Sequence, residues 1–422
     1  METHLSPEFS ATREGKEAEA ILRSCVHCGF CAATCPTYQL LGDELDGPRG
    51  RIYLMKQVLE GAEVSRSTQQ HLDRCLTCRN CETTCPSGVQ YGRLLDIGRH
   101  AVEARVERPA FEKSLRWLLR EGLTSPLFAP AMKLGQAVRP LLPAVLKKKV
   151  PVVSKAGTWP TREHPRKMLM LAGCVQPAMM PNINAATARV LDAAGIQTVV
   201  AAGAGCCGAI RSHLADTDGG LADMRRNVDA WWPLVQAGGI EAIVMNASGC
   251  GVTVKDYGHA LAHDPAYAER AAQIASLTRD LAELLGGWVP VLAPKLAARR
   301  QAGSPSVDTG VAAFHPPCTL QHGQQIRGVV EAGLRELGFE VQVAANESHL
   351  CCGSAGTYSV LQPVLAEQLR DRKLANLAPL SPAMIVSSNI GCIQHLQTGT
   401  GLPVRHWIEM LDDALHRGTP VE

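Results

Sequence analysis

Eight cysteines in the first quarter of the chain fall in two runs of identical spacing. Each run reads C-x2-C-x2-C-x3-C-P, and the residues are Cys25, Cys28, Cys31, Cys35 and Pro36, then Cys75, Cys78, Cys81, Cys85 and Pro86. Thiolates at successive steps of three residues wrap one iron–sulfur cubane, and the proline turns the outgoing chain away. The two runs therefore predict two 4Fe–4S clusters, close enough together to relay electrons.

The fourth cysteine of such a run binds the other cluster, which divides the eight thiolates into two predicted ligand sets. The first cluster is assigned to Cys25, Cys28, Cys31 and Cys85. The second cluster is assigned to Cys75, Cys78, Cys81 and Cys35. The alternative is structural zinc, which also takes four thiolates. Zinc requires neither the third C-x2-C step nor the trailing Cys-Pro, so the repeated pattern favours iron–sulfur clusters.

The other eight cysteines form two matched sets, each containing a Cys-Cys-Gly triplet. The sets are Cys174, Cys206, Cys207 and Cys250, and Cys318, Cys351, Cys352 and Cys392. Each cysteine follows a segment typical of a buried strand, and open α/β sheets bind their ligands at the carboxyl ends of strands. Free cysteines are also common as small buried residues. Adjacent cysteines at matched positions favour a further cluster or redox site in each copy.

Histidines are distributed unevenly between these two copies. Within four residues of a cysteine, the second copy has His315, His322, His349 and His395, whereas the first has His213 alone near its cysteines. The difference predicts that the second copy retains chemistry that the first lacks, such as proton delivery to an acceptor.

The elements that position these cysteines follow from the apolar patterns. Helical patterns at 51–61 and 92–106 flank the second cysteine run, and strands alternate with helices in both later copies, which predicts βαβ units on parallel sheets. The expected fold is a multidomain α+β chain. Its parts are a helical ferredoxin-like domain with two clusters (1–105), a basic, proline-rich helical linker or docking segment (106–165), a first module (166–300) and a second module (301–422).

Composition narrows the class of protein. The chain has 422 residues, 16 cysteines and a net charge of only +2, which does not favour nucleic-acid binding. The start of the chain has no secretory pattern, and we find no run of 18 apolar residues, so we expect a cytoplasmic protein with reduced thiols.

Residues 108–149 carry nine Lys or Arg and two Glu, interleaved with apolar side chains. Such a segment suits a membrane interface or a protein partner, and both remain open.

The linker DELDGPRGRIYLMKQVLEG (Asp43–Gly61) and the stretch HLDRCLTCRNCETTCPSGV (His71–Val89) carry a family resemblance. With the two Cys-Cys-Gly modules, they resemble bacterial glycolate oxidase (glycolate dehydrogenase) iron–sulfur subunits over nearly the whole chain. The resemblance implies a complex in which a flavoprotein subunit with FAD oxidises glycolate to glyoxylate, and less readily D-lactate. This chain would pass the electrons toward a quinone or another acceptor on the cytoplasmic face of the inner membrane, and by itself it is expected not to be catalytic.

Related families leave alternatives open. They include electron-transfer subunits of D-lactate and glycerol-3-phosphate dehydrogenases and the thiol–disulfide chemistry of heterodisulfide reductase. The fullest form of the module ends in C-x2-C, but Ala247 and Asn389 stand where this chain would need the extra cysteines. No G-x-G-x-x-G fingerprint follows a strand, so substrate oxidation is expected on a partner and not on this chain.

Overall fold

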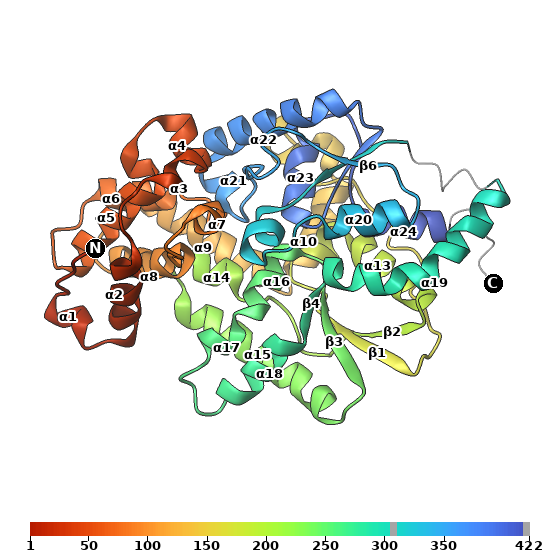
Figure 1. The fold of residues 1–422 in the computed structure, drawn as a ribbon, viewed down its shortest axis with the longest axis horizontal. Helices are drawn as coiled ribbons and strands as arrows, with labels where there is room; N and C mark the ends of the chain where they lie inside the picture. The colour runs from red at the N-terminus through yellow and green to blue at the C-terminus, as the bar shows by residue number, and fades with distance from the viewer. Residues whose placement is uncertain (304–309, 417–422) are drawn as a thin grey trace.

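The structure is a computed structural model that describes residues 1–303 and 310–416. Figure 1 shows a helical N-terminal part beside two sheet-containing parts, with helix α22 of the second module reaching toward the N-terminal helices. The predicted class is confirmed: a helical dicluster domain precedes two modules built on parallel sheets. The domain boundaries themselves remain predictions.

The N-terminal domain consists of short helices around a single small core. They are α1 (Pro7–Ser10), α2 (Arg13–Ser24), α3 (Phe30–Ala33), α4 (Pro36–Leu41), η1 (Glu44–Asp46), α5 (Pro48–Leu59), α6 (Arg66–Asp73), α7 (Asn80–Thr84) and α8 (Tyr91–Glu103). The helix expected from residue 51 begins at Pro48, because proline fits the first turn, where no N–H is needed. Its apolar face, with Ile52 and Met55, packs against α8 in this core.

The segment that follows is helical and lies at the surface. It contains α9 (Ala110–Thr124), α10 (Phe128–Ala137), the 3-10 helix η2 (Arg139–Leu141) and α11 (Ala144–Lys147). All residues of α9 and α10 are described, and none of them is buried. Two helices that carry large apolar side chains but bury none of them indicate that this segment is not an ordinary core element.

The first module has one four-stranded parallel sheet in the order β2-β1-β3-β4. Its elements are β1 (Arg166–Met170), α12 (Gln176–Met179), α13 (Pro181–Ala193), β2 (Ile196–Val199), α14 (Ala209–His213), α15 (Thr217–Gln236), β3 (Ile240–Met245), α16 (Ser248–Lys255), α17 (Tyr257–Ala260), α18 (Ala268–Leu277), β4 (Thr278–Asp280) and α19 (Leu281–Gln301). Three of the strands match expected ones. The three-residue β4 has too short a pattern to be predicted from sequence.

The second module repeats this order as β6-β5-β7-β8, again with every pairing parallel. Its elements are β5 (Ala312–His315), the π-helix η3 (Thr319–Gly323), α20 (Val329–Glu336), β6 (Val341–Val343), α21 (Tyr358–Leu361), α22 (Pro363–Leu377), η4 (Ala378–Leu380), β7 (Met384–Ser387), α23 (Ile390–Gln397), β8 (Val404–His406) and α24 (Trp407–His416). The duplication inferred from the sequence is therefore a duplication of topology.

The two modules share one hydrophobic core. It joins Met168 and Leu285 of the first module to Phe314 and Trp407 of the second. Helix α13 packs against α24, where the guanidinium of Arg189 pairs with the carboxylate of Asp412. The shared core fixes the carboxyl ends of both sheets relative to one another.

Helix α19 is, among the described residues, the one helix long and apolar enough to cross a membrane by length and composition. The sequence criterion of 18 consecutive apolar residues did not single it out. Its residues Leu285, Trp288, Leu292 and Leu296 lie in the core shared by the two modules. The helix therefore serves as a core element between the sheets in this structure.

Candidate functional site

The two cluster loops, residues 25–35 and 75–85, have matching backbones. His27 and Gly29 in the first loop have positive φ angles of 55° and 84°, and Thr77 and Arg79 in the second have 52° and 57°. Alternating left-handed residues curl each loop so that backbone N–H groups face inward. The N–H of Thr77 points at Sγ of Cys75, at 3.5 Å. The two loops thus share one backbone curl, which in the second loop places an N–H donor at a cysteine sulfur.

Cysteines of the first predicted set lie together across the two loops. Cys25, Cys28, Cys31 and Cys85 line one small cavity, which Cys81 of the second predicted set lines as well. Burial, and then the neighbouring Cys25, raises the pKa of Cys31 to about 11, with smaller effects from Cys28 and Cys85. Four thiols that line one small cavity are suited to a metal centre, whose positive charge is what makes thiolates stable there.

The second predicted set is also assembled. Burial raises the pKa of Cys81 well above its usual value, and the neighbouring Cys78, Cys75 and Cys35 add to the effect. Burial likewise raises the pKa of Cys78, with Cys318 of the second module as the next cause. The donor set therefore fits a second cluster, and it reaches a cysteine outside the ferredoxin-like domain.

A buried charge network supports the second set, and sequence reasoning missed it. Arg51 and Asp46 are both buried and lie in an ion pair of 3.4 Å. Arg51 also donates to Oγ1 of Thr37 at 3.1 Å, and Thr37 lies 3.3 Å from Sγ of Cys35. A fixed guanidinium beside cluster thiolates offsets their negative charge. The sign of this charge network in the sequence was the pair of acidic and basic residues, Asp46 and Arg51, within the 43–51 linker.

The glycine of each Cys-Cys-Gly triplet has a physical reason. Gly208 and Gly353 have φ angles of 95° and 90°. A Cβ atom at these positions would lie 2.8 Å from the carbonyl oxygen of Gly220 and 2.4 Å from that of Ala366. The N–H of each glycine donates to the first cysteine of its triplet, at 3.4 Å for Cys206 and 3.5 Å for Cys351. The turn therefore directs this sulfur toward the sheet edge.

The four cysteines of the first module form one array at that edge. Hydrogen bonds from the thiols of Cys174 and Cys207 lower the pKa of Cys206, and Cys207 in turn contacts Cys250. Cys174 and Cys250 are only half-buried. They open onto a cavity of about 1280 Å³ between the ferredoxin-like domain, the α9–α10 segment and both modules.

The array of the second module is buried throughout. Cys318 and Cys351 have sulfurs 3.8 Å apart, and all four cysteines of this module are buried. Cys318 and Cys351 also share an apolar cluster with Leu76 and Tyr358, and Cys78 of the second cluster loop packs against it. The second predicted cluster set and the second module are thus in direct contact.

The structure separates the histidines that the sequence grouped. His322 and His395 have ring nitrogens 2.8 Å and 2.9 Å from backbone carbonyls, so they serve as structural links. His349 is half-buried. His213 of the first module lies in the wall of the large cavity. Only His315 points toward cysteine sulfurs, and burial, with Lys373 nearby, lowers its pKa well below the usual value.

Ala247 and Asn389, which replace the extra cysteines, occupy matching N-cap positions of α16 and α23. The side-chain amide of Asn389 lies 3.8 Å from Sγ of Cys392. Both residues line the large cavity. Beside its cysteines, the first module therefore has the methyl group of Ala247, and the second module has the side-chain amide of Asn389.

Comparison with known proteins places these sites in families. Residues 21–89 match the model of a 4Fe-4S dicluster domain, and residues 168–255 and 312–397 each match that of a cysteine-rich domain. The chain is 54% identical to the glycolate oxidase iron-sulfur subunit of Escherichia coli (strain K12), over 99% of this chain and 100% of that protein. It is 29% identical to the probable glycolate oxidase iron-sulfur subunit of Bacillus subtilis (strain 168), over 90% and 89%. It is 23% identical to a lactate utilization protein of Bacillus licheniformis, over 58% and 99%.

Proposed function

Because this chain belongs to the family of glycolate oxidase iron–sulfur subunits, we propose that it carries electrons from a flavoprotein subunit that oxidises glycolate to glyoxylate. The chain is the iron–sulfur component of an oxidoreductase, and the hydride-accepting flavin belongs to the partner. The observation that carries the proposal is the sulfur path from the cluster loops into the second module, through Cys78, Cys318 and Cys351. The acceptor at the far end is a quinone or another electron acceptor.

Each cluster set supplies four thiolates, and bound iron–sulfur clusters take up and release single electrons. The ligands proposed for the first cluster are Cys25, Cys28, Cys31 and Cys85. The ligands proposed for the second cluster are Cys75, Cys78, Cys81 and Cys35. Cys28 is exposed, and beside it Val26 and Phe30 are 67% and 61% exposed. The first cluster thus lies at an apolar surface where a partner can dock, whereas the second lies inside.

The partner requirement is tested with the chain alone and with its complex. The purified chain is expected to hold at least about eight irons, from two cubanes, and to reduce no dye when glycolate is added. The complex that co-purifies with it is expected to contain FAD and to reduce the dye with glycolate, and more slowly with D-lactate. Glycolate-dependent dye reduction by the chain alone, or iron near zero with stoichiometric zinc, would refute the proposal.

The α9–α11 segment is proposed to contact the membrane that holds the quinone. Part of its positive charge is internal, because Arg108 and Arg116 pair with Asp73. The lysines of the segment, Lys113, Lys133, Lys147, Lys148 and Lys149, are exposed, and Lys149 also donates to the carbonyl of Ser359. Large apolar side chains are exposed along the same segment: Phe111 at 78%, Leu118 at 58%, Leu127 at 74%, Leu134 at 66% and Leu141 at 86%. Each lysine near anionic lipid contributes about 1 kcal/mol.

Vesicle flotation tests this contact in the assembled complex. The complex is expected to float with vesicles of anionic lipid and to float less after Lys147→Glu and Lys148→Glu together. Lys155→Glu, outside the helices of the segment, is the control for charge alone. If the complex does not float with anionic vesicles, the membrane contact is wrong and the apolar side chains belong to a protein interface.

A further inference from the structure

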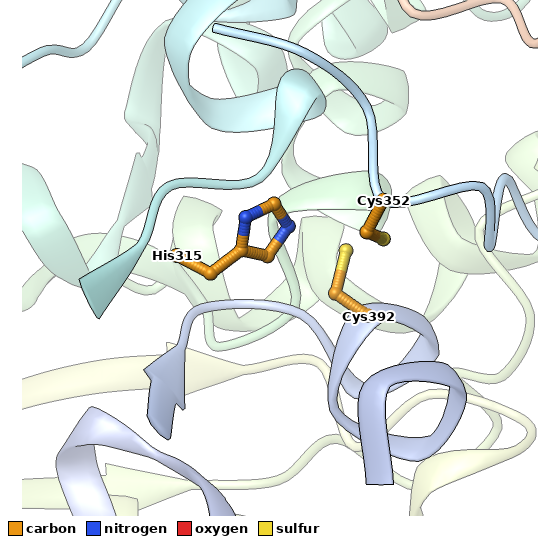
Figure 2. Close-up of side chains that lie close together, drawn as sticks. All are labelled: His315, Cys352 and Cys392. Carbon is orange, nitrogen blue, oxygen red and sulfur yellow. The ribbon is translucent and has the colours of Figure 1, made fainter. Parts of the chain in front are cut away.

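Three donor groups of the second module converge where its sheet ends. His315, Cys352 and Cys392 offer ligand atoms that all lie within 4.8 Å of one another, and all three residues are buried. Figure 2 shows the imidazole of His315 directed toward the two sulfurs. The residues come from three separate segments: the last residue of β5, the Cys-Cys-Gly turn and the first turn of α23. Convergence of this kind is typical of a metal site.

The imidazole of His315 forms no hydrogen bond with the described residues. The residue is 1% exposed, and neither ring nitrogen has a hydrogen-bond partner among the described residues. Burying an imidazole N–H without a partner costs free energy, so such a group calls for an explanation. Lys373 does not provide one, because its ammonium donates to the carbonyls of Glu347 and Ser348. A metal bound to one ring nitrogen would satisfy it.

The first module supplies an internal comparison. Cys174 and Cys318 are matching residues, and three positions before them stand Leu171 and His315. The strand pairings agree, since Met168 pairs with Thr198 as Ala312 pairs with Val341. Leu171 is buried at the position that matches His315, three residues before Cys174 of the first-module array. The fold therefore accepts an apolar side chain here, and the histidine is not a requirement of packing.

We propose that the second module binds an iron–sulfur centre in which the imidazole of His315 is an iron ligand beside the thiolates of Cys352 and Cys392. The inference rests on the proposed function, which makes this module part of the electron path. Cys318 and Cys351 extend the thiolate set, and Leu171 leaves the first module with sulfur donors only. The two centres then differ in charge, because imidazole binds as a neutral group and thiolate as an anion.

The ligand difference gives the two modules different redox properties. Replacing thiolate by imidazole raises the reduction potential of an iron–sulfur centre, as in Rieske centres. The second module, which contacts Cys78 of the second cluster loop, therefore holds the centre with the higher potential. Electrons that reach the second cluster then have a favourable acceptor next to them.

The test uses the intact complex, prepared anaerobically with 15N-labelled histidine, and pulsed EPR of its iron–sulfur signals. The ferredoxin-like clusters have cysteine ligands only, so hyperfine coupling to histidine nitrogen is expected from the second module alone. His315→Cys is expected to keep the iron, lose the nitrogen coupling and shift one midpoint potential downward. His315→Leu, which reproduces Leu171, is expected to lose the coupling and part of the iron. His349→Gln, a neighbouring histidine without sulfur contact, is the control and should change neither readout.

The outcomes separate this inference from the proposed function. Nitrogen coupling that persists in His315→Cys, or a wild-type complex with iron in the second module and no histidine coupling, overturns the ligand assignment alone. A wild-type complex with iron only in the two ferredoxin-like clusters, or with zinc at His315, overturns both the ligand assignment and the electron path through this module. The unaltered complex gives the decisive coupling, so the answer does not depend on how well a variant folds.

Discussion

The two cysteine modules share a strand order and four matched cysteines, yet their sulfur arrays have different surroundings. In the first module, Cys174 and Cys250 are half-buried and open onto the large cavity. In the second, every cysteine is buried and the array touches the second cluster loop. Cys318, Cys351 and Cys392 line the same cavity, so the two arrays differ in the exposure of their cysteines and in contact with the cluster loop, not in access to the cavity. The comparison teaches that docking of the ferredoxin-like domain gives two arrays with the same cysteine pattern different surroundings.

The contacts that hold the domain to the two modules differ in kind as well. Toward the second module they are apolar, with Leu76 packed beside Tyr358, and Tyr358 donates to the carbonyl of Arg74 at 3.1 Å. Toward the first module they are ionic, as in the pair of Arg93 and Asp256 at 3.1 Å. Apolar burial holds two bodies in one geometry more firmly than exposed ion pairs do. The second module is therefore the rigid neighbour of the second cluster loop.

The largest expected effect comes from replacing Cys351, the first cysteine of the triplet in the second module. Cys351→Ser should slow glycolate-dependent reduction of the acceptor by at least about tenfold, because a hydroxyl is a poor iron ligand and Cys351 adjoins Cys78. Stopped-flow kinetics and iron analysis of the complex measure the effect. Cys206→Ser in the first module is the matched variant, and it should leave electron transfer from the second cluster to the second module intact. If both variants block this step equally, the distinction between the modules is wrong.

A smaller effect is expected at the apolar contact. Leu76 is 3% exposed, so Leu76→Ala should lower the free energy of opening between the domain and the second module by about 2–5 kcal/mol. Hydrogen exchange of α22 reports this opening, and iron analysis checks that the clusters remain. Arg93→Ala is the control at the ionic contact. It should lower the free energy of opening between the domain and the first module by no more than about 1 kcal/mol, since both partners are about one-third exposed. Equal losses at the two contacts would contradict the argument.

The helices that follow β4 and β8 have matching caps with opposite pH responses. The side chain of Asp280 accepts from the N–H of Ala282 at 3.0 Å, and Nδ1 of His406 accepts from the N–H of Ile408 at 3.0 Å. Burial raises the pKa of Asp280 to about 6 and lowers the pKa of His406 to about 3. A neutral ring is the form that accepts the cap hydrogen bond.

The signs follow from the protons bound in each state. Unfolded His406 binds a proton below its ordinary pKa of 6.5 while the folded ring does not, so its contribution to stability is lost as the pH falls from 6.5 toward 3. Unfolded Asp280 loses its proton at its ordinary pKa of 3.8, whereas folded Asp280 keeps it up to about pH 6. The contribution of Asp280 to stability is therefore lost as the pH rises from 3.8 to 6. Each slope is at most about 1.4 kcal/mol per pH unit.

Hydrogen exchange of α19 and α24 between pH 4 and 7 measures these slopes. His406→Asn keeps a capping acceptor and removes the titration, so it should flatten the acid-side loss of stability in α24. Asp280→Asn is the matched change in the first module and should remove the opposite slope in α19. The comparison fails if α24 is equally protected at pH 4 and pH 7 before any substitution.

The smallest expected effect concerns the cation beside each array. Lys373 is 2% exposed near the second array, whereas the side chain of Arg226, near Cys206, is 46% exposed. Lys373→Gln should lower the midpoint potential of the second-module centre by roughly 40–90 mV, because one buried charge at this range is worth about 1–2 kcal/mol per electron. Arg226→Gln should shift the first-module centre less, since water screens its charge. Redox titration followed by EPR compares the two, and equal shifts would contradict the difference in burial.

Much of the molecule follows from the sequence alone. Cysteine spacing predicts the two cluster loops, and the matched Cys-Cys-Gly triplets predict the duplicated parallel sheets, which the structure shows. These features are local: a loop of eleven residues or one βαβ unit contains the whole pattern that specifies it. The short strands β4 and β8, with the sequences TRD and VRH, were missed, because neither carries the apolar pattern that separates a strand from a loop.

Only the tertiary structure decided which of the similar residues act together. The sequence grouped four histidines by their distance from cysteines, but His322 and His395 turn to backbone carbonyls, and His315 turns to the sulfurs of Cys352 and Cys392. The contact of Cys78 with Cys318 joins residues 240 positions apart. Spacing along a chain fixes what a short loop can bind, whereas packing of the shared core and the docked domain fixes which loops meet.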